Sequence, residues 1–278
     1  MRSTAASIAR LGKVVGSVGE TLLGLVYPEV CALCRCRRAG AASGYVCEAC
    51  RHRVHRIGAP ICPRCGQPFT GAVPAGPGPC GDCRDGRFSW DRARAAVIAE
   101  GVALECIHRL KYGNEPWFAT FLSALLVEAA LPDLSGCRIR GIVPVPLHPV
   151  RLRERGFNQA ERLARPLAEA LGVPLVTDRV RRLEPTASQA SLSREERRLN
   201  VRTAFGASGH DPMPGSWVVV DDVLTTGATT DAVCRVLRGL GAEAVSVWAV
   251  ARAAFEPGAA IPIDRDRSPP SVAVIRDA

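Results

Sequence analysis

Short runs of apolar residues alternate with helical patterns along most of the chain after residue 90. The runs that we expect to form strands are 93–99, 139–143, 173–176, 217–220 and 244–250. Between several of them, apolar residues recur at the three- and four-residue spacing of a helix that buries one face, in 102–110, 117–130 and 159–171. Strands that alternate with helices predict an α/β fold with a mainly parallel sheet.

The two ends of the chain depart from this alternation. Residues 1–26 place apolar side chains at helical spacing, with three basic residues and no acid before Glu20. We expect an amphipathic helix that docks on the domain behind it, with a transit peptide as the alternative and no secretory signal. Residues 257–278 are rich in proline and predict a mobile tail. No run of 18 apolar residues would cross a bilayer.

Eight cysteines between these regions form four CxxC pairs, a pattern typical of zinc ligands. Two such turns supply the four sulfurs of one tetrahedral zinc site, and glycine and proline between the pairs leave few apolar residues for a separate core. We therefore predict two structural Zn²⁺ sites in residues 27–89, with disulfides or iron–sulfur clusters as alternatives. The pairs are Cys31 and Cys34, Cys47 and Cys50, Cys62 and Cys65, and Cys80 and Cys83.

Ligation by consecutive pairs makes two successive zinc ribbons. Spacing alone leaves a cross-braced arrangement of the four pairs open as the alternative. Cys36, His52 and His55 lie close enough in sequence to be substitute ligands, although we interpret them as bystanders. Removing residues 27–89 and both ends leaves 90–256 as the α/β domain.

Charge is concentrated in the same N-terminal region. The chain has a formal charge of +9, and residues 1–90 carry 12 Lys and Arg against 5 Asp and Glu. A basic surface attracts nucleic-acid phosphates. Two zinc ions, each bound by four thiolates, would lower the total to about +5, which weakens the nucleic-acid interpretation.

Residues 218–230 combine a buried strand, two acids and a turn of small residues. We expect the strand to end at two exposed acids, Asp221 and Asp222, and a helix to follow over 231–240. Amide groups of the turn, hydroxyl groups and the helix N-terminus would surround a phosphate, and the carboxylates suit a ribose diol. The turn residues are Thr225, Thr226, Gly227, Ala228 and Thr229.

This segment resembles the phosphoribosyl-pyrophosphate (PRPP) signature of type I phosphoribosyltransferases. The resemblance implies that Asp221 and Asp222 bind the ribose hydroxyls, that Thr225 to Thr229 hold the 5′-phosphate, and that Mg²⁺ rides on the pyrophosphate. In that fold the loop after an earlier strand holds the pyrophosphate. Arg155, near the start of the following helix, is our candidate for that contact and for a catalytic role together with the two acids.

The whole order of motifs resembles the ComF/ComFC family of competence proteins. Four further segments fit that pattern besides the CxxC pairs and the signature: Leu110-Lys-Tyr-Gly113, Val143-Pro-Val-Pro-Leu147, Arg155-Gly-Phe-Asn-Gln159, and Thr186 to Val201. The resemblance implies a cytoplasmic protein that handles incoming single-stranded DNA, with competence or helicase proteins as partners. It also implies a mobile hood over 185–200, and Lys111 and Tyr112 could approach the site from the preceding helix.

Two other functions remain open at this point. The first is a nucleobase phosphoribosyltransferase of salvage metabolism whose zinc is only structural. The second is a regulator that binds PRPP without turnover. The sequence contains no recognisable base-binding determinant, so it predicts neither the acceptor nor the oligomeric state.

Overall fold

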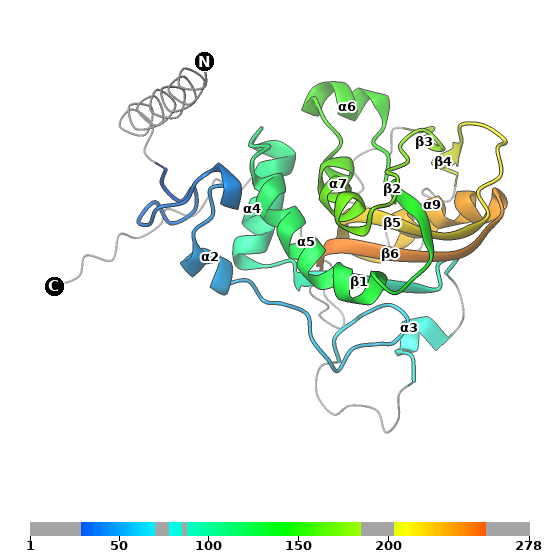
Figure 1. Ribbon diagram of the computed structural model, residues 1–278, viewed down its shortest axis with the longest axis horizontal. Coiled ribbons are helices and arrows are strands. Elements are labelled where there is room, and N and C mark those ends of the chain that lie inside the picture. The colour runs from blue at the N-terminus through cyan, green and yellow to red at the C-terminus, as the bar shows by residue number, and fades with distance from the viewer. Residues whose placement is uncertain (1–28, 70–77, 85–87, 185–202, 254–278) are drawn as a thin grey trace, which may run out of the picture.

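The computed structural model describes residues 29–69, 78–84, 88–184 and 203–253. Its main sheet has the strand order β1-β6-β5-β2, and all neighbouring strands are parallel (Figure 1). The strands are β1 (Arg92–Ile98), β2 (Ile139–Pro144), β5 (Gly215–Leu224) and β6 (Ala242–Arg252). The predicted α/β fold with a mainly parallel sheet is therefore confirmed. The predicted helix 1–26, hood 185–200 and tail 257–278 lie wholly or almost wholly outside the described residues.

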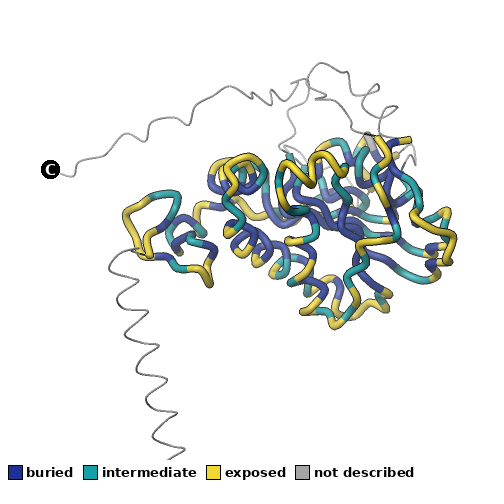
Figure 2. Tube along the Cα trace, turned by 90° about the horizontal axis from the view of Figure 1, so that it is seen from above, coloured by how far each residue is buried: buried dark blue, intermediate teal, exposed yellow. Residues whose placement is uncertain are grey.

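Helices cover both faces of this sheet because successive residues of the central strands point to opposite sides. Val218 and Val220 of β5 pack with α5 (Phe118–Leu134) and α7 (Gln159–Leu171), whereas Val219 packs with α9 (Ala228–Gly239). A short antiparallel pair lies on the α9 side and consists of β3 (Val180–Arg182) and β4 (Phe205–Ala207). The buried part of the chain runs through these central strands (Figure 2).

Most predicted elements form where the pattern places them. The helix expected over 159–171 has those same bounds, because the Asn158 side chain caps its start and Gly172 adopts the left-handed conformation at its end. The helix expected over 102–110 is α4 (Gly101–Tyr112). The run 173–176 forms no named strand and contributes only a parallel bridge between Leu175 and Ile142.

The bounds around the acidic segment were predicted wrongly. Strand β5 does not end before the acids but continues through them to Leu224, because β6 is long enough to pair with it up to Arg252. The next helix begins at Ala228 rather than at residue 231. A further short helix, α6 (Pro149–Arg155), interrupts the loop after β2, with Pro149 at its first position.

The cysteine segments share the interior of the α/β domain. Val46 and Val54 near the first four cysteines belong to the same buried cluster as Phe118 and Leu122 of α5. The segment also contains η1 (Ala41–Ser43) and α2 (Glu48–His52), and the second cysteine segment contains α3 (Gly81–Arg84). None of the helices in the described ranges is long and apolar enough to cross a membrane.

Candidate functional site

The two acids lie at the carboxyl edge of the sheet, where the neighbouring strand stops. Pro144, the last residue of β2, is opposite Val220, so β5 extends beyond β2 from Asp221 onward. This edge is where open α/β sheets usually bind ligands. Both acids are buried, with exposures of 8% for Asp221 and 4% for Asp222, so the expectation that they are exposed is wrong.

The alternation of the strand separates the two carboxylates. Val218 and Val220 of β5 belong to the buried cluster of α4, α5 and α7, and Asp222 meets Lys111 near the end of α4, with 2.8 Å between Lys111 Nζ and Asp222 Oδ2. The carboxylate of Asp221 instead accepts a hydrogen bond of 2.8 Å from the backbone N–H of Asp222. Lys111, which the motif resemblance placed near the site, is thus in direct contact with it.

Burial and mutual repulsion dominate the electrostatics of this pair. Burial, and then the charge of Asp222, raises the pKa of Asp221 to about 7, although Lys111 acts in the opposite direction. Burial alone would lower the pKa of Lys111, but the attraction of Asp222 and Asp221 outweighs it and raises that pKa. Lys111 therefore remains an ammonium ion that partly neutralises two closely spaced carboxyl groups.

Two arginines come close enough to this pair to interact with it electrostatically. Arg155 ends α6, lies with its guanidinium carbon 5.7 Å from the ring centre of Tyr112, and donates a hydrogen bond to Gln159. Burial lowers the pKa of Arg155, and the charge of Asp222 opposes that shift. Arg182 of β3 is affected in the same way by Asp221. Arg182 was not predicted as a site residue, because nothing in its local sequence pattern distinguishes it from a surface arginine.

The turn after β5 forms the beginning of α9. Gly227 occupies the N-cap position with a φ of 78°, a left-handed conformation that glycine adopts at little cost. The hydroxyl of Thr226 accepts a bond of 3.4 Å from Ala228 N–H, Thr229 is half-buried, and Thr225 is exposed. The first amide groups of a helix attract anions, so the turn has the chemistry of a phosphate site.

Two aromatic rings pack against this turn. Phe88 and Trp90 stack with their centres 4.3 Å apart, and a Cβ on Gly227 would lie 3.6 Å from Phe88 and 3.7 Å from Trp90. Ser89 N–H between them donates to the carboxylate of Asp231 in α9. The chain just after the second cysteine segment therefore sets the position of the turn.

The cysteines form two groups of four in sequence order, with all sulfurs of a group within 4.8 Å of one another: Cys31, Cys34, Cys47 and Cys50, and then Cys62, Cys65, Cys80 and Cys83. Sulfur separations in the two groups include values of 3.7 and 3.8 Å. Tetrahedral Zn–S bonds of about 2.3 Å require sulfurs about 3.8 Å apart, so the donor set fits zinc. Ligation by consecutive pairs is the arrangement that this grouping supports.

One cysteine in each group, Cys31 and Cys62, has a lowered pKa that favours the thiolate, whereas burial raises the pKa of Cys50 and Cys83. Burial acts to raise the pKa of Cys31, but hydrogen bonds from backbone N–H groups lower it to about 6. The N–H of Cys80 donates to the sulfur of Cys62 at 3.3 Å. The proposed substitute ligands lie outside both groups: Cys36 donates to a backbone carbonyl, and His52 and His55 contact Glu48 and Glu100.

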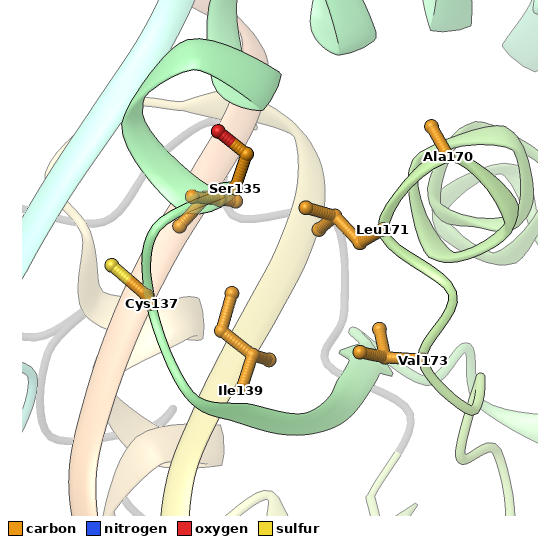
Figure 3. A pocket seen from close by; sticks show the side chains of 7 residues that line it. Ser135, Cys137, Ile139, Ala170, Leu171 and Val173 are labelled. Carbon is orange, nitrogen blue, oxygen red and sulfur yellow. The ribbon is translucent and has the colours of Figure 1, made fainter.

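A small cavity of about 190 Å³ lies at the other end of the sheet, by the start of β2 (Figure 3). The side chains that line it are apolar apart from Ser135 and the exposed thiol of Cys137. None of the predicted site residues lines it, so it is separate from the acids and the phosphate turn.

Comparison with known proteins identifies the family. A double zinc ribbon domain model matches residues 22–84, and a phosphoribosyl transferase domain model matches residues 155–260. Competence protein F of Haemophilus influenzae is 32% identical over 80% of this chain and 96% of its own length. The chain belongs to the competence protein F family. DNA utilization protein YhgH of Escherichia coli K12, also similar, is 35% identical over 82% of this chain and 99% of that protein.

Family membership confirms the predicted resemblance and the order of the two modules. An adenine phosphoribosyltransferase structure aligns with half of the chain and 71% of its own, at 17% identity and a TM-score of 0.34. The fold assignment therefore rests on the two family models, the parallel sheet and the cysteine groups.

Proposed function

We propose that the protein binds Mg²⁺–PRPP and acts in the handling of DNA that the cell takes up. The observation that carries the proposal is one continuous segment at the carboxyl edge of the sheet. Two acids on β5 are followed by a turn of small residues that opens α9 through a left-handed glycine. Few ligands other than a phosphorylated sugar use both a diol-binding carboxylate pair and a phosphate cradle.

Each predicted residue has a role in this proposal. Asp221 and Asp222 accept hydrogen bonds from the ribose hydroxyls, and the turn from Thr225 through Thr226, Gly227 and Ala228 to Thr229 holds the 5′-phosphate. Arg155, close to Asp222 and Tyr112, contacts the pyrophosphate. Mg²⁺ supplies charge neutralisation of the pyrophosphate oxygens.

If the protein transfers the phosphoribosyl group, its residues act mainly by position and charge. Bond breaking at C1 leaves a positive, oxocarbenium-like sugar and a negative pyrophosphate. The buried carboxylates lie on the side of the ribose, and Arg155 lies where the leaving group gathers charge, so both favour charge separation.

The DNA role rests on the relatives together with the N-terminal module. The relatives are named Competence protein F and DNA utilization protein YhgH. Their alignments with this chain cover 96% and 99% of their own lengths. The first cysteine group carries exposed Arg35, Arg37, Arg38 and Arg53 beside its metal ligands. We propose that two structural Zn²⁺ ions hold this surface, that it contacts single-stranded DNA and competence or helicase proteins, and that the protein works in the cytoplasm.

Calorimetric titration with Mg²⁺–PRPP tests the central claim. We expect saturable binding to the wild-type protein and its loss in the variant that combines Asp221→Asn with Asp222→Asn. Glu243→Gln is the matched control, because this exposed acid lies at the opposite, amino end of β6. Absence of binding to the wild-type protein, or equal binding to the double variant, would contradict the proposal.

A panel of nucleobases with Mg²⁺–PRPP separates turnover from sensing. Release of pyrophosphate with at least one base would identify a transferase of the salvage type. Binding of Mg²⁺–PRPP without release for any base would identify PRPP as an effector of DNA handling. For the DNA contact, affinity for a single strand should fall steeply as salt rises, and affinity that is absent or independent of salt would remove it.

A further inference from the structure

Lys111 is an unusual residue in this chain. The sequence has 36 Lys and Arg, of which only Lys13 and Lys111 are lysine. An ammonium group is a compact charge on a flexible stem, whereas a guanidinium group is a rigid planar fork. Nearly all the basic residues of this chain are arginines. Lys111, the one lysine in the described segments, contacts an acid of the candidate site.

The contact between Lys111 and Asp222 is well shielded from water. The two side chains are 19% and 6% exposed, and 2.8 Å separates Nζ from Oδ2. Lys111 is the residue before the last of α4, and Gly113 caps that helix. The side chain thus extends from a helix end toward the strand, and its charge occupies one oxygen of a carboxylate that we assign to the ribose.

The charged groups around the acids are arranged by side. Lys111 and Arg155 lie on the Asp222 side, where Arg155 of α6 packs over the ring of Tyr112 from α4, and Arg182 lies on the Asp221 side. The phosphate turn begins directly after the end of β5, at Thr225, three residues after Asp222.

PRPP carries an anionic group at each end of its ribose, so a PRPP site needs cationic or hydrogen-bond-donating groups at two places. The turn that opens α9 provides for the 5′-phosphate. The pyrophosphate on C1 then needs cations elsewhere; Lys111 contacts the diol-binding acid Asp222, and Arg155 interacts with the same acid electrostatically. A pyrophosphate carries more charge than one carboxylate, so it competes well for the Lys111 ammonium.

We propose that Lys111 is an exchangeable cation, which neutralises Asp222 in the free protein and moves to the pyrophosphate when PRPP binds. When Lys111 moves to the pyrophosphate, Asp222 Oδ2 becomes free to accept a hydrogen bond from a ribose hydroxyl. Neither group is left buried and unpaired in either state. This inference rests on the proposed function and adds a positioning role for one residue.

Two ligands that differ only in the pyrophosphate test the exchange. Mg²⁺–PRPP and ribose 5-phosphate are titrated against the wild-type protein, Lys111→Met and Lys111→Arg. Loss of a charge-assisted contact corresponds to about 10- to 100-fold in affinity. We expect Lys111→Met to weaken PRPP by about that factor while ribose 5-phosphate binds as tightly as before or more tightly. Lys111→Arg keeps the charge and should retain part of the preference for PRPP.

An equal loss for both ligands would show that Lys111 only maintains the fold, and no loss for either would show that it takes no part; both results overturn the inference. Failure of the wild-type protein to bind PRPP is a different outcome and contradicts the proposed function itself. If Lys111→Met does not fold, Asp222→Asn alone is compared with Asp222→Asn plus Lys111→Met. The double variant should prefer PRPP over ribose 5-phosphate by about 10- to 100-fold less than the single variant, and the remaining preference comes from Arg155.

Discussion

Trp90 links the second cysteine segment to the phosphate turn. Replacing it tests how much its side chain contributes to the stability of the fold and to PRPP binding. The indole is 2% exposed, stacks on Phe88 at an angle of 17°, and has the Arg64 guanidinium carbon 5.9 Å from its ring centre. A Cβ on Gly227 would lie 3.7 Å from its ring. Trp90→Ala removes one of the two rings beside the turn, whereas Trp90→Phe keeps an aromatic ring in the same place.

The expected loss of unfolding free energy differs strongly between Trp90→Ala and Trp90→Phe. Truncation of a buried tryptophan to alanine costs about 3–5 kcal/mol of unfolding free energy, and the aromatic stack adds about 0.5–1.5 kcal/mol beyond area alone. The indole N–H finds no hydrogen-bond partner in the described part of the chain. A buried unsatisfied donor costs about 1–3 kcal/mol. Because Trp90→Phe removes this penalty along with some apolar contact, we expect it to lie within about 1 kcal/mol of wild type.

Urea unfolding and titration with Mg²⁺–PRPP measure the two effects. Trp90→Ala should lower the denaturation midpoint and weaken PRPP binding, since Gly227 loses the surface that holds the turn. Trp90→Phe should change neither by much. The reasoning is refuted if Trp90→Phe destabilises as much as Trp90→Ala, or if Trp90→Ala folds and binds PRPP as tightly as wild type.

Three other changes have defined outcomes. Arg155→Ala should weaken Mg²⁺–PRPP by about 10- to 100-fold in calorimetry, with ribose 5-phosphate much less affected. The folded protein raises the pKa of Asp221 from 3.8 to about 7, so the folded state binds more protons than the unfolded state in that window. The contribution of Asp221 to the free energy of unfolding therefore falls as the pH rises from about 4 to 7. Urea unfolding at a series of pH values should show this fall in the wild-type protein and not in Asp221→Asn. Elemental analysis should find two zinc ions per chain, and their chelation should lower the thermal midpoint; zinc far below two would contradict the ligand assignment.

The pattern of residues predicted the elements whose signals are local. The helix over 159–171 has an apolar stripe, an asparagine at its start and a glycine after its end, and it formed with those bounds. The cysteine spacing likewise predicted two groups of four, because each CxxC turn brings its own two sulfurs together. Such features depend on neighbours within a few residues.

The remaining features depend on contacts between distant segments. The strand that carries Asp221 and Asp222 continues to Leu224 only because β6 pairs with it, and the acids are buried because α4 and β3 approach them. A two-residue period does place the acids on opposite faces, but the sequence does not say which helix faces each one. Arg182 could not be recognised for the same reason.

The two cysteine groups adjoin different parts of the site. The first packs against α4, where Arg109 donates a hydrogen bond of 2.8 Å to the carbonyl of Ala32, and Lys111 is the residue before the last of this helix. The second lies beside the phosphate turn, since Arg252 donates to the carbonyl of Cys65 at 2.8 Å and pairs in register with Leu224 at the end of β5.

Each group thus stabilises the element that we assign to one end of PRPP. The first supports the cation for the pyrophosphate, and the second supports the turn for the 5′-phosphate. Serine replacement of a ligand in the first group should therefore reduce PRPP affinity more than ribose 5-phosphate affinity, whereas replacement in the second should reduce both. If both replacements leave folded protein with the same ratio of affinities, the cysteine groups act on overall stability alone. A difference in that ratio would show that each group acts through the element it contacts.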